Sequence, residues 1–215
     1  MTDELVYANI TYVMEDERRK QTEQNLIKSG KAEFLSKGYA KANLRDICKA
    51  AGVTTGAFYF SFENKEALLA AILDPVIAEY RNMCSGLAQR EEDDPGTAED
   101  NERLMMEYLS AHRAEVIILM EKSGGSRYEG FRKQVDAQMQ AAFTSYFTKF
   151  MDKSPDPELI RILVAMRLCG YMELVKGDYT VKERVRLAKD IGIHADAGTI
   201  SLIKYLKEAD RKSVV

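Results

Sequence analysis

Apolar residues recur at steps of three and four along most of the chain, a spacing that predicts amphipathic α-helices. The first such stripe runs through residues 20–36 and ends at Gly38, a residue type typical of helix C-termini. Two shorter helices follow closely, one opened by Asn43 and one, Thr55–Phe60, capped by Thr54. Strand-like alternation is absent from the sequence. The pattern therefore predicts an all-α protein of about nine helices.

Residues 43–62 have the spacing of a helix-turn-helix unit. Asn43 and Asp46 form a variant of the capping box that can satisfy the first free amides of the first short helix. Two consecutive alanines at the end of that helix allow close approach, and Gly52 permits the positive φ of a tight turn. Helix, tight turn and helix in this order are the elements of a helix-turn-helix motif.

The second short helix carries the candidate DNA-binding residues. Thr54, Thr55 and Tyr59 place hydroxyl groups near its start and on its outer face, where they can reach phosphates or base edges. Arg45 and Lys65 flank the same face. A cation in the first turn of a helix is unfavourable to the helix dipole, so Lys65 is expected to serve a phosphate. The alternative is a plain helical hairpin in which the threonine is only a cap and the tyrosine only a surface residue.

The charge distribution favours an anionic partner for this region. The chain has a net charge of −3, yet residues 18–65 hold ten basic and four acidic residues. Residues 1–17 hold five acidic residues and no Lys or Arg, and the part after residue 65 is net negative. A compact basic block on an acidic body indicates that the block alone binds a polyanion such as DNA.

Several motifs follow one another here without a gap, and together they point to a known family. They are Phe34–Tyr39 (FLSKGY), Leu44–Ile47 (LRDI), Ala50–Val53 (AAGV), Gly56–Tyr59 (GAFY) and Phe62–Glu66 (FENKE). Over about residues 20–80 the chain closely resembles the N-terminal domain of the tetracycline-repressor (TetR) family of bacterial transcription regulators. The remaining residues match no motif of that family.

The resemblance implies that Thr55–Phe60 is a recognition helix lying in the major groove. The family's usual DNA-facing positions correspond to Thr54, Thr55, Gly56, Tyr59 and Phe60, and Lys65 corresponds to a position that contacts the DNA backbone. Two departures affect base specificity. Thr55 stands where the family often has Lys or Arg, and Phe60 replaces a more usual Tyr or His, so it offers only apolar contact, for example to a thymine methyl group.

Three regions are predicted along the chain. Residues 1–17 form an N-terminal extension, residues 18–66 the helix-turn-helix DNA-binding domain, and residues 67–215 an effector-binding and dimerisation domain. The extension is expected to form an additional short helix, with a flexible acidic arm as the alternative. A capping box at Thr180–Glu183 opens the last helix, which either continues to Lys207 or breaks near Gly192 or Gly198.

The segment Leu159–Val175 is apolar on more than one face, which requires one partner within the subunit and another across an interface. One short recognition helix reads few bases, so a dimer that reads two half-sites is also expected. In the TetR family the last two large helices of each subunit form a four-helix dimer interface, and the resemblance implies the same here. The expected interface residues are Leu159, Ile162, Leu163, Met166, Ile191 and Ile200.

A ligand cavity is the second expectation for the C-terminal region. Eight of the ten Met residues lie between residues 83 and 172, together with several aromatic residues. Thioethers and aromatic rings at the centre of a helical bundle can line a cavity for an apolar or aromatic ligand, although an ordinary core is the alternative for each of them. The candidate lining residues are Met105, Tyr108, Met120, Tyr128, Phe143, Phe147 and Met166.

Other classes of protein are disfavoured. No apolar run is long enough to span a bilayer and the N-terminus has no signal-like pattern, so a soluble cytoplasmic protein without a membrane partner is expected. The two histidines have no second ligand at helical spacing, so neither a metal site nor a cofactor is expected. Of the three cysteines, Cys48 and Cys169 lie within apolar periodicities and are expected to be small core residues.

These features predict a sequence-specific DNA-binding transcriptional regulator. The favoured form is a homodimeric repressor that binds a palindromic operator in double-stranded DNA and is released by a small-molecule effector. A constitutive DNA-binding factor controlled by a protein partner is the second hypothesis. A small helical enzyme is the third, and it has the least support because no Ser/His/Asp group, Cys/His group or Gly-rich phosphate loop occurs.

Overall fold

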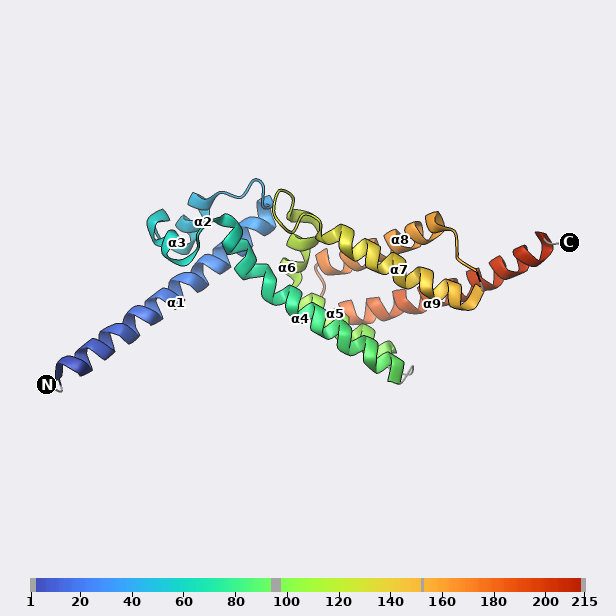
Figure 1. Cartoon of the computed structure of the whole chain (residues 1–215), viewed down its shortest axis with the longest axis horizontal. Coiled ribbons are helices and arrows are strands. Elements are labelled where there is room, and N and C mark those ends of the chain that lie inside the picture. Colours follow the sequence, from blue (N-terminus) through green and yellow to red (C-terminus); the bar gives the residue numbers. More distant parts are fainter. Residues whose placement is uncertain (1–2, 94–97, 152, 214–215) are drawn as a thin grey trace. The chain divides into compact units, whose positions relative to one another are not determined.

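The protein is described here by a computed structural model over residues 3–93, 98–151 and 153–213 (Figure 1). In these ranges the elements are α1 (Asp3–Lys37), α2 (Leu44–Ala51), α3 (Thr55–Ser61), α4 (Lys65–Asp93), α5 (Ala98–Ala111), α6 (Arg113–Ile117), the π-helical turn η2 (Ile118–Lys122), α7 (Phe131–Met151), α8 (Pro157–Lys176) and α9 (Val181–Ser213). No strand occurs among them. The all-α prediction is therefore confirmed. None of the helices in these ranges is long and apolar enough to span a bilayer.

The chain forms two compact units. Unit 1 contains the residues up to Asn82 together with Ile118–Glu129, and unit 2 contains Met83–Ile117 together with the residues from Gly130 onward. One boundary thus lies inside α4, and another separates α6 from η2. The segment Ile118–Glu129, which follows α6 in sequence, belongs to unit 1, where it contacts α1 and α4.

Both terminal helices are longer than predicted. α1 runs without a break from Asp3 to Lys37, so the prediction of a separate short helix before residue 18 is wrong. The sequence has no Gly or Pro between Asp3 and Ser29, and therefore no stop signal. α9 likewise passes through Gly192 and Gly198 and ends at Ser213.

The local signals of the helix-turn-helix are satisfied with one exception. The Asn43 side chain accepts a hydrogen bond from the Arg45 amide at 2.8 Å, and Gly52 ends α2 with a φ of 71°. The other half of the capping box does not form. The amide of Asn43 donates to Glu33 Oε1 of α1 at 3.1 Å, while Asp46 pairs with Lys37 at 3.0 Å. A residue from a neighbouring helix thus replaces the one expected in the same turn.

The core of unit 1 is built where α1, α2, α3 and the first half of α4 meet. Its fully buried side chains are Leu26, Phe34, Ile47, Phe58, Leu68, Leu69 and Leu73. Gly30 allows α1 to approach α4 closely, because a Cβ atom there would lie 2.7 Å from Cδ2 of Leu68. The helix-turn-helix is therefore held on a rigid helical base.

In unit 2, two arginines hold the C-terminal end of α8. The buried guanidinium of Arg184 donates to the carbonyl oxygens of Leu174 at 2.9 Å and Gly177 at 3.0 Å. Arg113 donates to the carbonyl oxygens of Val175 and Lys176. These bonds satisfy carbonyl groups that the end of a helix leaves without an intrahelical partner. They tie α6 and the start of α9 to α8.

Candidate nucleic-acid interface

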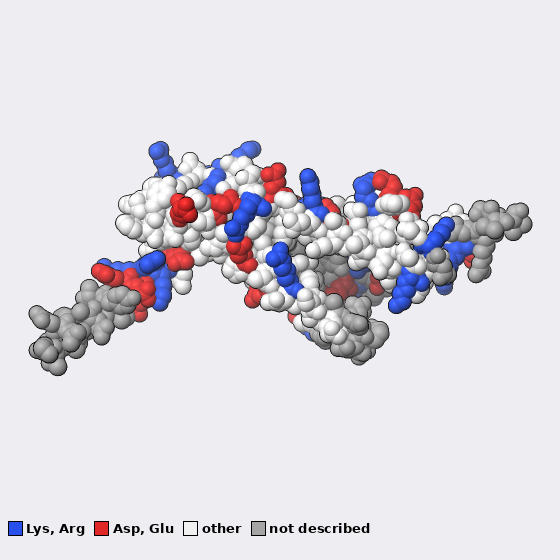
Figure 2. Space-filling model, in the orientation of Figure 1, with Lys and Arg blue, Asp and Glu red and all other residues white. Residues whose placement is uncertain are grey.

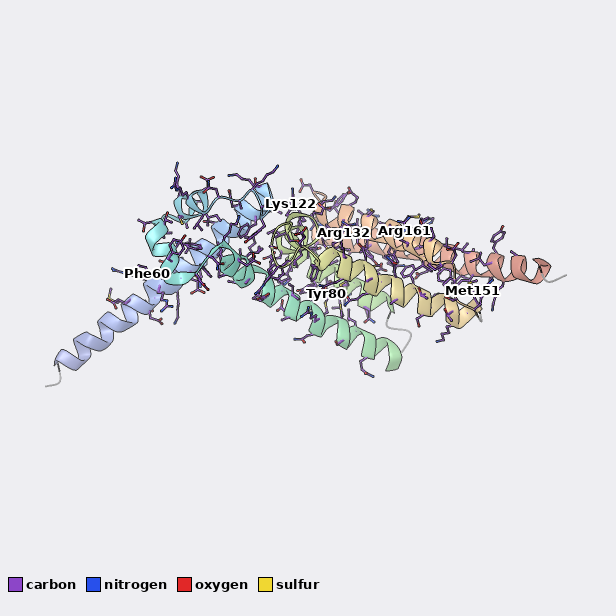
Figure 3. The ribbon with its side chains drawn as sticks, turned by 45° about the horizontal axis from the view of Figure 1, so that its top comes forward. Phe60, Tyr80, Lys122, Arg132, Met151 and Arg161 are labelled. Carbon is purple, nitrogen blue, oxygen red and sulfur yellow. The ribbon has the colours of Figure 1, made fainter. Side chains whose placement is uncertain are left out.

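The helix α3 presents the residues predicted to contact DNA. Its Phe58 is fully buried and anchors the helix, whereas Tyr59 is 58% exposed and Phe60 is 84% exposed. Phe60 projects from α3 at the surface of unit 1 (Figure 3). Thr55 and Gly56 are also exposed, at the N-terminal end of the helix. The outer side of α3 thus carries two aromatic rings that are open to a partner.

Thr54 has the structural role that its position predicted. Its side chain accepts a hydrogen bond from the Ala57 amide at 3.1 Å, which fixes the start of α3. The residue is nevertheless exposed, so the hydroxyl hydrogen can still be donated outward. The cap and a DNA contact are thus compatible at this position.

Arg45 lies exposed on α2 beside this face. Lys41 and Lys49 are exposed on the same part of unit 1. Figure 2 shows basic side chains projecting from this unit, with acidic groups near them. The local surface can therefore attract a polyanion, although not as an unbroken basic patch.

Lys65 has structural partners that sequence reasoning missed. Its Nζ donates to the carbonyl oxygens of Tyr39 at 2.7 Å and Ala42 at 3.2 Å, and it lies 4.3 Å from the centre of the Tyr39 ring. The argument that a cation at this helix start needs a phosphate is therefore wrong. Burial and the nearby Glu66 carboxyl raise the pKa of Tyr39 to about 12. Contact between Lys65 and DNA stays a prediction.

The substitution Lys65→Met is expected to lower the free energy of unfolding by about 2 kcal/mol, because two carbonyl groups lose a charged donor. Urea unfolding followed by circular dichroism measures this change. Lys41→Met is the control, since Lys41 is exposed in the same turn region, and it should stay within about 0.5 kcal/mol of the unsubstituted protein. Unchanged stability with a weaker salt dependence of DNA binding would instead assign Lys65 to a phosphate.

A polar cluster in unit 1 was not predicted from the sequence. Arg127 donates to Asp74 of α4 at 2.5 Å, and the Tyr128 hydroxyl donates to the same carboxylate at 2.5 Å. The Arg127 amide also donates to Glu66 at 2.9 Å. Burial and the Asp74 charge raise the pKa of Tyr128 to about 12. More than fifty residues separate these partners, so no local pattern could have paired them.

The turn η2 is bonded directly to the segment that connects α1 to α2. The carbonyl oxygen of Lys122 accepts a hydrogen bond from the Tyr39 amide at 2.8 Å. The adjacent Gly38 has a φ of 74°, and a Cβ atom there would lie 3.4 Å from the same carbonyl oxygen. Figure 3 labels Lys122 at this place. Segment 118–129 is thus part of the structure that positions α2 and α3.

The residues predicted to line a ligand cavity are distributed over both units. Met120 and Tyr128 belong to unit 1, and the other five belong to unit 2. Phe147 is fully buried, and Met105, Tyr108, Met120 and Phe143 are half-buried. Met166 is 67% exposed, so its assignment to an internal cavity of the subunit is wrong. For the others, ligand binding stays a prediction.

The predicted dimer face is apolar and open in the single chain. Ile162, Met166, Ile191 and Ile200 are exposed, and Leu159 and Leu163 are half-buried. The opposite side of α8 is buried within unit 2. Cys169 is exposed as well, so its expected place in the core is wrong, whereas Cys48 is buried as predicted. The helix therefore has the two apolar faces that its sequence indicated.

Comparison with known proteins supports the interpretation of unit 1. Residues 26–72 match the bacterial regulatory proteins of the tetR family. The chain is 33% identical over 79 residues to the HTH-type transcriptional regulator TtgR of Pseudomonas putida, covering 37% of this chain and 38% of that one. It is 34% identical over 67 residues to the HTH-type transcriptional repressor DhaR of Mycobacterium sp., covering 31% and 34%. The chain thus spans little more than a third of the length of these relatives.

Solved structures extend the likeness in fold to most of the chain. A transcriptional regulator (TerR/AcrR family) from Aquifex aeolicus has a TM-score of 0.52 at 21% identity, over 80% of this chain and 98% of that one. NalD, the secondary repressor of the MexAB-OprM multidrug efflux pump in Pseudomonas aeruginosa, has a TM-score of 0.52 at 19% identity, over 83% and 97%. Residues 26–72 therefore match the helix-turn-helix domain of the bacterial regulatory proteins of the tetR family, and the solved structures show that the rest of the chain has a similar fold.

Proposed function

We propose that this protein is a transcriptional repressor of the bacterial cytoplasm that binds a palindromic operator as a homodimer. The observation that carries the proposal is α3, which is anchored by the buried Phe58 and exposes Thr55, Tyr59 and Phe60 on its outer side. A relative that matches the same region, DhaR, is named a transcriptional repressor. In this proposal residues 18–66 bind DNA, and residues 67–215 form the dimer and bind an effector.

The effector is proposed to be a small apolar or aromatic molecule held in the C-terminal region. Support comes from the half-buried Met105, Tyr108 and Phe143 and the buried Phe147 of unit 2. The ligand would favour a conformation in which the two recognition helices no longer match successive grooves, so that DNA is released. The alternative is a constitutive DNA-binding factor whose C-terminal region responds to a protein partner.

The test is DNA binding by the full chain, measured by fluorescence anisotropy at fixed salt. The operator is first selected from random duplexes. Tyr59→Ala is expected to weaken operator binding at least tenfold, because each subunit of the dimer loses a contact. Tyr179→Ala is the matched control, since Tyr179 is also exposed but lies between α8 and α9, and it should leave binding unchanged. Equal affinities for all three proteins would reject α3 as the recognition helix.

A panel of apolar and aromatic molecules added to the same complex tests the effector. Release of the operator by one compound, with a rise in the melting temperature of the free protein, is expected from a ligand that binds the DNA-free conformation. Specific DNA binding that no compound disturbs would favour the factor controlled by a protein partner.

A further inference from the structure

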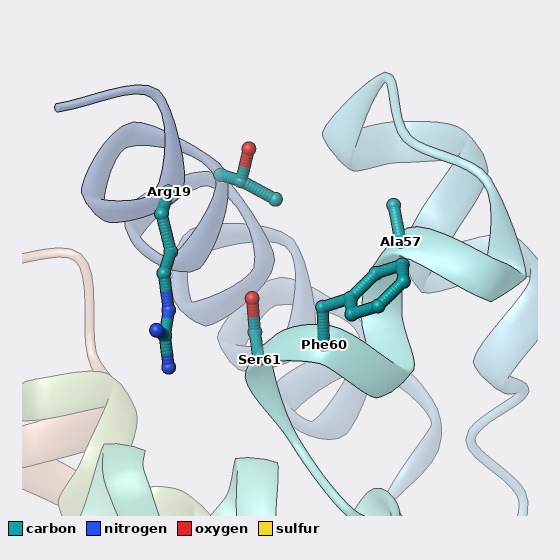
Figure 4. A pocket seen from close by; sticks show the side chains of 5 residues that line it. Arg19, Ala57, Phe60 and Ser61 are labelled. Atoms are coloured by element: carbon teal, nitrogen blue, oxygen red, sulfur yellow. The ribbon is translucent and has the colours of Figure 1, made fainter. Parts of the chain in front are cut away.

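A groove of about 340 Å³ lies between α1 and α3 in unit 1. Arg19 and Thr22 of α1 form one wall, and Ala57, Phe60 and Ser61 of α3 form the other. Figure 4 shows Arg19 on α1 and, across the groove, Phe60 and Ser61 on α3. The groove is therefore continuous with the outer face of the proposed recognition helix.

The groove has an available positive charge. Arg19 is exposed, and neither it nor the neighbouring Arg18 forms an ion pair with any described residue. The next cation, Lys20, is different, because its Nζ lies 2.6 Å from Asp16 on the same helix. Arg19 is thus the cation that faces the groove with its charge uncompensated.

The other lining groups fit a sugar–phosphate unit. A guanidinium binds a phosphate through parallel charged hydrogen bonds. Ser61 supplies a hydroxyl that can donate to a second phosphate oxygen, whereas the Thr22 hydroxyl is already donated to the Arg18 carbonyl at 2.9 Å. The exposed ring of Phe60 offers an apolar surface of the kind that packs against a deoxyribose. The lining therefore combines one cation, one hydroxyl donor and one ring.

We propose that this groove binds one backbone phosphate of the operator, with Arg19 and Ser61 as phosphate ligands and Phe60 against the adjoining sugar. The inference rests on the proposed function and adds α1 as a second DNA-contacting helix. It also gives Phe60 a role that needs no base contact. Glu15 and Glu17 are exposed on the preceding turn of α1, and their charges disfavour a further phosphate contact along the N-terminal extension.

The test is the salt dependence of DNA binding by the full-length Arg19→Gln variant. Each phosphate contact contributes a slope of about 0.9 to the plot of log affinity against log salt concentration. Loss of one contact per subunit is expected to reduce the slope by about 2 in the dimer and to weaken binding about tenfold at low salt. Because the contact is to the backbone, operator and unrelated duplexes should be affected by the same factor.

Lys28→Gln is the matched control. Lys28 is exposed on α1 nine residues after Arg19, which places it on the opposite side of the helix. It should leave the slope unchanged. An equal reduction of slope by both variants would mean a general charge effect and would overturn the inference. So would an unchanged slope for Arg19→Gln in an experiment where Tyr59→Ala weakens binding. Failure of the unsubstituted protein to bind any selected duplex would instead reject the proposed function.

The substitution Phe60→Ala tests whether the Phe60 ring packs in the groove or contacts a base. If the ring packs on the same sugar–phosphate unit, Phe60→Ala and Arg19→Gln should be coupled, so that the double variant loses less affinity than the two single losses combined. Additive losses would place Phe60 away from the phosphate that Arg19 binds, and would overturn the shared site.

Discussion

The double variant Ile162→Glu, Met166→Glu is expected to be monomeric and to bind its operator at least about 100-fold more weakly than the unsubstituted protein. Ile162 is 43% exposed and Met166 is 67% exposed, one turn apart on α8. Carboxylates fit these positions in the single chain because water surrounds them. In a dimer that buries this face, four carboxylates would be desolvated without partners, which no apolar interface tolerates.

The loss of DNA affinity follows from the loss of the second half-site. Two linked recognition helices bind with an effective concentration that raises overall affinity by about 10² to 10⁴. Sedimentation equilibrium measures the oligomeric state, and fluorescence anisotropy with the selected operator measures binding. A double variant that remains dimeric would place the interface on another face.

Two exposed alanines of α7 provide the control for added charge. Ala141→Glu, Ala142→Glu introduces the same two carboxylates in unit 2, and both positions are open to water. This variant should stay dimeric and bind the operator normally. Leu163 is left unchanged because it is half-buried, and a carboxylate there would disturb the fold of the subunit.

Phe58→Ala is expected to destabilise unit 1 by about 4 kcal/mol, the usual cost of removing a buried aromatic ring. Phe58 is fully buried in α3, and its ring centre lies 5.4 Å from that of Tyr59 and 5.7 Å from that of Phe62. The cavity would loosen α3 from the core beneath it. On heating, operator binding should therefore be lost at a lower temperature than in the unsubstituted protein, while the proposed dimer of unit 2 persists.

Phe60→Ala is the matched control for this prediction, because it removes the same ring from the same helix. Phe60 is 84% exposed, so its removal should change stability by no more than about 0.5 kcal/mol. Differential scanning calorimetry compares the two variants. Greater destabilisation by Phe60→Ala than by Phe58→Ala would mean that α3 lies in the opposite orientation, with Phe60 inward.

The helix-turn-helix could be predicted from local sequence signals alone. Its caps at Asn43 and Thr54 and its turn at Gly52 are correct, because each depends on backbone groups within four residues. The buried side of α3 at Phe58 and the open side at Tyr59 follow from helical periodicity, which the sequence also contains.

The pairing of groups that are distant in the sequence could not be predicted, because it depends on how the helices pack. Glu33 of α1 replaced Asp46 as the acceptor for the Asn43 amide, and two carbonyl groups between α1 and α2 accept hydrogen bonds from the Lys65 ammonium. A sequence shows that a polar group needs a partner, but several helices can offer one.

The groove, the Asp74–Arg127 pair and the open face of α8 also could not be predicted from local sequence signals. The groove at Arg19 exists only because α1 continues past the helix-turn-helix and α3 packs beside it. The pairing of Asp74 with Arg127 joins segments that are distant in the chain. Helical periodicity likewise placed Met166 and Cys169 on the apolar helix α8. It did not show that the face carrying them is exposed to solvent in the single subunit. Helix signals act within a few residues, whereas burial and polar pairing depend on which helices pack together, and that is fixed only when the whole chain has folded.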